Sequence, residues 1–171
     1  MVEEPAGWGG AASPHPNFLM HTAAVTGFAL ALADAGDSGL VLREWRRDEE
    51  AWEHWRDGDR DLHVAPDGLL RADAFGRSVV ALVEVDRGTM TQPRLRGKAL
   101  RHLRYAHDRA WAGRHPWPPP LLFLTTSEDR ARRQLDGVDR LRVSSRRKSR
   151  VSIAFAWTGA ARHLWRPRSH R

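Results

Sequence analysis

The chain lacks several features that would point to common classes of protein. It has no cysteine among its 171 residues, which excludes disulfides, thiolate catalysis and cysteine-based zinc or iron–sulfur sites. No uninterrupted apolar run approaches the roughly 20 residues that a membrane span needs. The N-terminus has neither the basic flank nor the apolar stretch of a secretory signal. We therefore expect a cytoplasmic protein without a membrane partner.

Two further sites of catalysis or binding are missing from the sequence. The glycines near the N-terminus precede no strand–helix unit, so there is no glycine-rich phosphate loop. The nine histidines show no paired metal spacing, and His102 and His107 are predicted to face different sides of one helix, so we assign no zinc site. His21 could approach an acidic site, but a surface or capping role is the plainer expectation.

The length and composition fit one folded domain. A chain of 171 residues can bury one hydrophobic core but not two comfortable ones. With 41% hydrophobic and 29% charged residues, the composition is typical of a globular protein. We predict a flexible arm over residues 1–17, a domain over 18–157 and a basic tail over 158–171.

The charges are unevenly distributed along the chain. Residues 1–86 hold 16 acidic residues against 7 arginines, whereas residues 87–171 hold 5 acidic residues against 21 lysines and arginines. The resulting net charges of −9 and +16 suggest one surface for a polyanion. Most of the cationic residues are arginine rather than lysine. A GC-rich genome would explain that preference, but it would not explain why the cationic residues gather in the C-terminal half.

The pattern of apolar residues and breakers predicts an α/β fold. The expected order is helix, three strands with a small helix after the first, helix and strand, with a further short helix and a final strand. The predicted helices cover 18–34, 48–56, 91–111 and 128–135, and the predicted strands cover 40–45, 68–72, 78–85, 121–126 and 151–157. Residues 58–61 are read as a loop. The segment 79–85 is apolar on both faces, so it should be an inner strand, flanked by 68–72 and by 40–45 or 121–126.

Acidic residues mark the end of this inner strand. The period of two places Glu84 and Asp86 on one face, and Asp67 opens the preceding strand of the predicted pair. A carboxylate at the end of a buried strand needs a cation, and a divalent metal is one suitable partner. An ion pair with Arg87 or Arg94, or a cap on the next helix, remains the alternative.

The helix that follows offers a lysine. Lys98, His102, Tyr105 and Arg109 step along it by 4, 3 and 4 residues, which predicts one polar edge beside an apolar stripe. Lys98 could therefore lean over the strand end. Carboxylates with a nearby lysine suit metal-dependent phosphodiester hydrolysis, in which the metal activates water and polarises the phosphate.

A set of short motifs in this region has a characteristic spacing. In chain order the motifs are His21, Trp45-Arg-Arg-Asp-Glu49, Pro66-Asp67, Glu84-Val-Asp86-Arg-Gly-Thr89, Lys98 and Tyr105. Over roughly residues 18–135 the chain resembles the replication-relaxation family of plasmids, phages and integrative elements in actinobacteria and other Gram-positive bacteria. The run from Glu84 to Thr89 is the most specific part of this resemblance.

The resemblance implies a fold and a site. The family is similar to the PD-(D/E)xK nucleases, which implies a restriction-endonuclease-like α-β-β-β-α-β sandwich with a central mixed sheet. Asp67, Glu84 and Asp86 would then be the ligands of Mg²⁺ or Mn²⁺, and Lys98 would join them in catalysis.

The chain departs from the family pattern in two places. The nuclease signature has a lysine two residues after the second acid, where this chain has Asp86, so Lys98 on the next helix would have to replace it. Otherwise the site is degenerate and the fold serves binding alone. Longer family members carry an N-terminal winged helix that binds DNA, and we expect that segment to be missing here.

Two functions therefore follow as hypotheses. The first is a DNA-binding accessory protein of plasmid or mobile-element replication or mobilisation, with DNA as its partner and a replication or mobilisation protein as an optional second one. The second is an active Mg²⁺- or Mn²⁺-dependent endonuclease, and we prefer the first because of Asp86. The basic residues assigned to nucleic-acid binding are Arg94, Arg101, Arg146, Arg147, Lys148 and Arg150. A solvated loop and a disordered end would account equally well for the last four.

Overall fold

The computed structural model describes residues 15–74, 76–144 and 152–157. The tail predicted over 158–171 lies outside these residues, as do Arg146, Arg147, Lys148, Arg150 and most of the predicted arm. The elements are α1 (Pro16–Ala33), η1 (Asp34–Ser38), β1 (Leu40–Arg47), η2 (Asp48–Ala51), β2 (Glu53–Asp57), β3 (Arg60–Val64), β4 (Gly68–Ala74), β5 (Arg77–Val85), α2 (Gln92–His107), β6 (Leu121–Thr125), α3 (Glu128–Ser144) and β7 (Ile153–Trp157).

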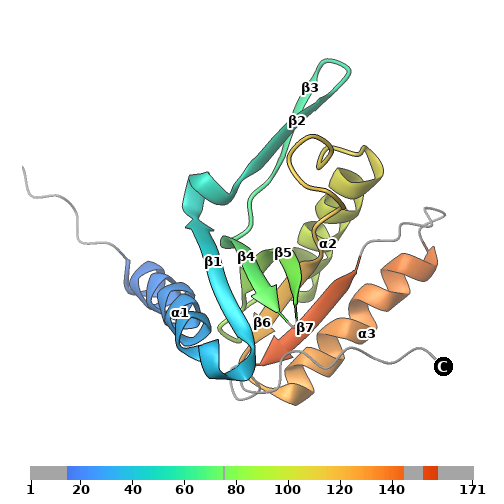
Figure 1. Ribbon diagram of the computed structural model, residues 1–171. Coiled ribbons are helices and arrows are strands. Elements are labelled where there is room, and N and C mark those ends of the chain that lie inside the picture. The colour runs from blue at the N-terminus through green and yellow to red at the C-terminus, as the bar shows by residue number, and fades with distance from the viewer. Residues whose placement is uncertain (1–14, 75, 145–151, 158–171) are drawn as a thin grey trace, which may run out of the picture.

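Five of the strands form one mixed sheet in the order β1-β4-β5-β6-β7 (Figure 1). The pairs β1–β4 and β4–β5 are antiparallel, and β5–β6 and β6–β7 are parallel. A helix connects each parallel pair, as such crossovers require. The predicted α/β fold with a central mixed sheet is confirmed.

The helices cover the two faces of the sheet unequally. α2 and α3 lie on one face, where Leu95 and Val138 pack with Leu82 and Phe123 in one core cluster. α1 lies on the other face, where Val25 and Leu32 join a second cluster that includes Val83. The alternation along β5 explains both clusters, because Leu82 and Val83 point to opposite faces.

The inner-strand prediction for 79–85 is confirmed. β5 pairs with β4 on one side and β6 on the other, and its residues from Val80 onward are buried. The strand pair predicted over 68–72 and 78–85 is also present, since β4 and β5 are antiparallel and Ala74 pairs with Arg77. The carboxyl end of β5, with Glu84, therefore lies at the end of the sheet where the chain leaves the strands and continues into α2.

The predicted polar helix over 48–56 is wrong. Only Asp48–Ala51 form a short 3-10 turn, and Glu53–Asp57 form a strand that pairs with Arg60–Val64. The predicted loop at 58–61 is the tip of this hairpin and the start of β3. Figure 1 shows the β2–β3 hairpin extending away from the five-stranded sheet.

The other helices differ from prediction mainly at their ends. α2 ends at His107 rather than near residue 111, and α3 runs to Ser144 rather than to residue 135. α1 begins two residues earlier than predicted, within the predicted arm. These ends depend on tertiary packing, which helix-forming propensity does not report.

α1 is unusually apolar for a helix on the surface of a sheet. The segment Pro16–Gly36 has a mean hydropathy of 1.4 over 21 residues, enough by length and composition alone to cross a membrane, and 11% of its most apolar window is buried. A core helix of a soluble protein passes the same test. α1 also contributes Val25 and Leu32 to the core. The structure does not test whether the protein has a membrane partner, so the expected absence of one stays a prediction.

Candidate functional site

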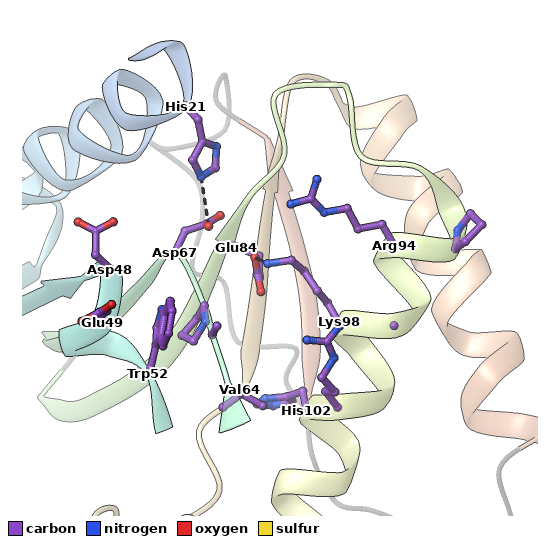
Figure 2. A pocket seen from close by; sticks show the side chains of 15 residues that line it. His21, Asp48, Glu49, Trp52, Val64, Asp67, Glu84, Arg94, Lys98 and His102 are labelled. Carbon is purple, nitrogen blue, oxygen red and sulfur yellow. Dashed lines mark hydrogen bonds and ion pairs between the residues drawn. The ribbon is translucent and has the colours of Figure 1, made fainter. Parts of the chain in front are cut away.

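A cavity of about 640 Å³ opens beside the carboxyl end of β5 (Figure 2). One wall is α2, which contributes Arg94, Lys98 and Arg101. The opposite wall is η2 and the residue after it, with Asp48, Glu49 and Trp52. Asp67 and Glu84 lie between these walls, and His21 reaches the cavity from α1.

Asp67 is fixed at the entry to β4 by two contacts. Its Oδ2 accepts a hydrogen bond of 2.7 Å from the backbone N–H of Val85, and its Oδ1 lies 3.1 Å from Nε2 of His21. The first contact ties the start of β4 to the end of β5, as the predicted strand pair requires. The second shows that His21 does reach the acidic site, contrary to the plainer expectation of a surface or capping role.

Glu84 is buried against Lys98. Its carboxylate accepts a hydrogen bond from Nζ of Lys98, and the residue is only 3% exposed. Burial, and to a smaller extent the neighbouring Asp67 carboxylate, raise the pKa of Glu84 to about 8, although Lys98 opposes the rise. Asp67, Glu84 and Lys98 thus lie together as predicted from the sequence, and the partner of Glu84 is Lys98 rather than an arginine.

Asp86 has a different set of partners. Its Oδ2 accepts hydrogen bonds of 2.7 Å from Arg130 and 2.5 Å from Gln134, both on α3. Its Oδ1 accepts the backbone N–H groups of Gly88 and Met90 at 2.9 Å each. Burial raises the pKa of this carboxyl, but the bonds from Arg130, Met90 and Gln134 outweigh it and lower the pKa overall. Asp86 therefore fastens α3 and the turn after β5.

The geometry limits which residues can hold a metal ion together. Among the residues that the structure describes, no three histidine or acidic side chains are grouped to bind one ion. Asp67 and Glu84 are nevertheless neighbours, and Mg²⁺ is commonly held by one or two carboxylates together with phosphate oxygens. Two carboxylates are a donor set that suits a divalent cation, but metal binding by this pair and the role of Asp86 as a third ligand both stay predictions.

Two of the arginines on α2 line the cavity without a competing partner among the described residues. Arg94 and Arg101 are exposed and make no ion pair with any side chain that the structure describes. They lie on one face of the helix with Lys98, at spacings of four and three residues. Both were assigned to nucleic-acid binding from the sequence, and their place in the cavity wall leaves their guanidinium groups available to an anion.

The polar edge predicted for α2 is only partly correct. His102 and Tyr105 are buried, and Arg109 lies beyond the end of the helix. Burial lowers the pKa of His102 to about 4, so its imidazole is neutral at pH 7. Tyr105 instead contacts Glu53, with its hydroxyl 3.4 Å from Oε2. Only Lys98 of the four predicted residues faces the acidic pair.

A second cavity continues the first toward α1. It measures about 350 Å³ and shares His21, Asp67, Arg94 and Lys98 with the larger cavity. Backbone and side chains of the turn after β5 line its other side, including Arg87, which donates a hydrogen bond of 3.1 Å to the backbone carbonyl of Asn17. The two cavities together form a groove across the carboxyl end of β5.

Sequence reasoning missed Trp52, Arg130 and Gln134. Trp52 is 37% exposed and lines the larger cavity. Its position was hidden by the incorrect helix over 48–56. Arg130 and Gln134 are 44 and 48 residues from Asp86, and no local pattern signals a contact over that separation.

Comparisons with known proteins give one match. No curated protein matches the chain, and no solved structure matches it either. The model of the replication-relaxation family matches residues 5–119, about two thirds of the chain. The matched part includes α1, the β4–β5 pair and α2. The matched residues include His21, Asp67, Glu84 and Lys98. The chain therefore belongs to the replication-relaxation family.

Proposed function

We propose that this protein binds DNA as an accessory factor in the replication or mobilisation of a plasmid or other mobile element. Membership of the replication-relaxation family suggests the biological setting. The observation that carries DNA binding is the wall of α2, where exposed Arg94 and Arg101 flank Lys98 along a cavity of about 640 Å³. Arginine binds phosphate oxygens with two parallel hydrogen bonds, which suits it to a nucleic-acid backbone.

The charge of the chain supports the same proposal. The C-terminal half, which begins just before α2, has a net charge of +16. Cations that neutralise phosphates release condensed counterions, so the affinity should fall steeply as the salt concentration rises. A role in binding rather than cleavage is favoured because Lys98 already occupies the carboxyl group of Glu84, and Arg130 already pairs with Asp86.

The test compares two double variants in DNA binding. We expect Arg94→Ala with Arg101→Ala to weaken binding of a mixed-sequence duplex and of a single strand. The slope of log affinity against log salt should fall by about 1.8 for the duplex and about 1.4 for the single strand. Arg77→Ala with Arg96→Ala removes the same charge from exposed positions outside the cavity and serves as the control. Equal losses in both double variants would contradict a binding site on this wall.

An active nuclease is the second candidate function. It is favoured by the neighbouring Asp67 and Glu84 carboxylates with Lys98 beside them. The order of α1, β1, β4, β5, α2 and β6, with the β2–β3 hairpin left out, also agrees with the α-β-β-β-α-β order of PD-(D/E)xK nucleases. Asp67 and Glu84 would hold Mg²⁺ or Mn²⁺, which when bound would polarise a phosphate and activate water. Lys98 would stabilise negative charge on the phosphate.

Metal binding and cleavage are tested separately. If the pair binds a divalent cation, Mg²⁺ or Mn²⁺ should raise the melting temperature of the wild type, because the metal binds the folded state. Glu84→Gln should abolish that increase. Cleavage that requires the metal and disappears in Lys98→Ala would establish the nuclease. We expect metal stabilisation without cleavage, which would leave a binding protein.

A further inference from the structure

The β2–β3 hairpin exposes a cluster of aromatic rings. Trp52 precedes β2, and His54 of β2 is paired with His63 of β3. The rings of Trp52 and His63 are stacked, with centroids 5.8 Å apart and planes inclined by 17°. His54 lies 5.5 Å from His63 and 6.3 Å from Trp52. Both histidines are exposed, so these three rings do not belong to a core.

This aromatic cluster borders the cavity. Trp52 lines it beside Asp48 and Glu49, on the wall opposite Arg94 and Lys98, as Figure 2 shows. One wall is therefore aromatic and acidic, and the other is cationic. A polyanion in the cavity would be held by α2 and repelled by Asp48 and Glu49.

The cationic wall suits the phosphates of a single nucleic-acid strand, and the aromatic wall suits its bases. A nucleic-acid strand carries phosphates on one side and bases on the other. Phosphates against Arg94 and Arg101 would direct the bases toward Trp52, where stacking on aromatic rings is favourable for any base. An intact duplex has its bases paired and stacked inside, and it would bring a second row of phosphates toward Asp48 and Glu49.

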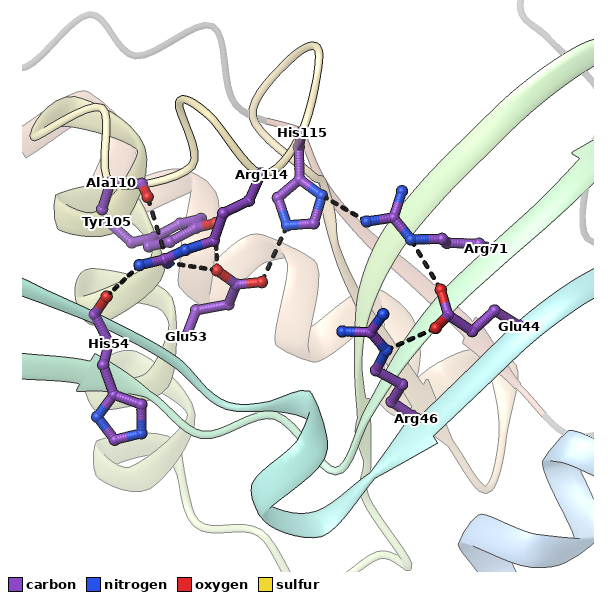
Figure 3. Close-up of polar contacts among 9 residues, drawn as sticks. All are labelled: Glu44, Arg46, Glu53, His54, Arg71, Tyr105, Ala110, Arg114 and His115. Carbon is purple, nitrogen blue, oxygen red and sulfur yellow. Dashed lines mark hydrogen bonds and ion pairs between the residues drawn. The ribbon is translucent and has the colours of Figure 1, made fainter.

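The hairpin is held in place by a polar network on its other face (Figure 3). The buried Glu53 accepts hydrogen bonds of 2.6 Å from Arg114 and 2.9 Å from His115. Arg114 also donates a bond of 2.6 Å to the backbone carbonyl of His54. Trp55 donates to Asp108 at 3.2 Å. The exposed rings are thus presented on a fixed support, which lowers the entropic cost of stacking.

We propose that Trp52, supported by His63 and His54, is a stacking platform for unpaired bases, so that the cavity selects single-stranded over double-stranded DNA. This inference rests on the proposed function, since it assigns the class of DNA that the same cavity binds. It adds a specificity residue on the wall opposite the phosphate-binding arginines.

The test separates base contacts from phosphate contacts. The probes are a labelled oligomer of 12 thymidines, an abasic oligomer with the same number of phosphates, and a 12-base-pair duplex. Wild type should bind the thymidine oligomer more tightly than the other two. Trp52→Ala should weaken binding of the thymidine oligomer by about 5- to 150-fold and leave the abasic oligomer nearly unchanged. Trp52→Phe should keep most of the affinity, because an aromatic ring remains.

Trp117→Ala is the matched control. Trp117 is also exposed, at 46%, but it lines neither cavity. Its removal should change no affinity, and thermal melts should show that both alanine variants are folded. The platform is refuted if Trp52→Ala binds the thymidine oligomer as tightly as wild type does, or if it loses the same affinity for both oligomers. It is also refuted if wild type binds the duplex more tightly than the thymidine oligomer. If wild type binds none of the three probes at low salt, the proposed function itself fails.

Discussion

The buried carboxyl of Glu84 makes the stability of the folded protein depend on pH. Its pKa is about 8 in the folded protein, against 4.5 for an exposed glutamate, because burial disfavours the charged form. A group whose pKa is raised by folding stabilises the protein fully below its unfolded pKa. That contribution is lost as the pH rises through the folded pKa. One pKa unit corresponds to about 1.4 kcal/mol, so the full effect is about 5 kcal/mol.

The assay is denaturant unfolding of wild type and Glu84→Gln at pH 5, 7 and 9. The free energy of unfolding of Glu84→Gln, relative to that of wild type, should be about 4 kcal/mol higher at pH 9 than at pH 5, because glutamine does not ionise. The difference between the two proteins is the useful quantity, since the titration of all other groups largely cancels. Glu49→Gln, at an exposed carboxylate of the same cavity, controls for the loss of one negative charge. Parallel pH profiles for wild type and Glu84→Gln would refute this account.

Lys98 provides a second variant for the same measurement. Its ammonium group lowers the pKa of Glu84, against the larger effect of burial. Lys98→Met should therefore raise the pKa of Glu84 further, so the loss of stability should begin at the same pH as in wild type but continue to a pH above 8. A loss that ends at the same pH as in wild type would show that the ion pair does not influence this titration.

Two further predictions concern the ends of β5 and β4. Asp86→Asn should lower the free energy of unfolding by about 3–5 kcal/mol, because it leaves Arg130 without its buried counter-ion. Asp73→Asn, which breaks a surface ion pair with Arg43, should lower it by at most about 1 kcal/mol. Equal losses in denaturant unfolding would contradict the structural role of Asp86. Gly68→Ala should cost about 1–3 kcal/mol in the same assay, since the new methyl carbon would lie 2.3 Å from the ring of Trp45. No loss would mean that the ring moves aside freely.

The centre of the fold could be predicted because its signals are local. The strand 79–85 is apolar on both faces, which is typical of an inner strand covered on both sides. Asp67 and Glu84 meet because they stand at adjacent ends of one antiparallel pair, and that pairing follows from the turn between β4 and β5. Lys98 reaches Glu84 from the next helix along the chain. Each of these contacts spans a short connection.

The hairpin could not be predicted because its stabilising contacts are distant in sequence. Residues 48–56 contain several good helix formers, and local propensity therefore favours a helix. Glu53 and Trp55 instead lie on one face of a strand, held by Arg114 and Asp108 more than 50 residues downstream. These contacts outweigh propensity, and they also turn Trp52 toward the cavity rather than the core.

Under the proposed function, the charge at position 86 bears on the choice between binding and cleavage. The nuclease signature has a lysine two residues after the second acid. In this protein Asp86 occupies that position, and α3 supplies Arg130 and Gln134 to match it. The exchange is therefore compensated: a cation from α3 meets Asp86, while Lys98 from α2 meets Glu84. Because the buried acidic groups at the end of β5 already have partners, the arginines of the larger cavity that are left to meet a new anion are Arg94 and Arg101 on α2. That distribution of charge favours holding a phosphate backbone over cutting it.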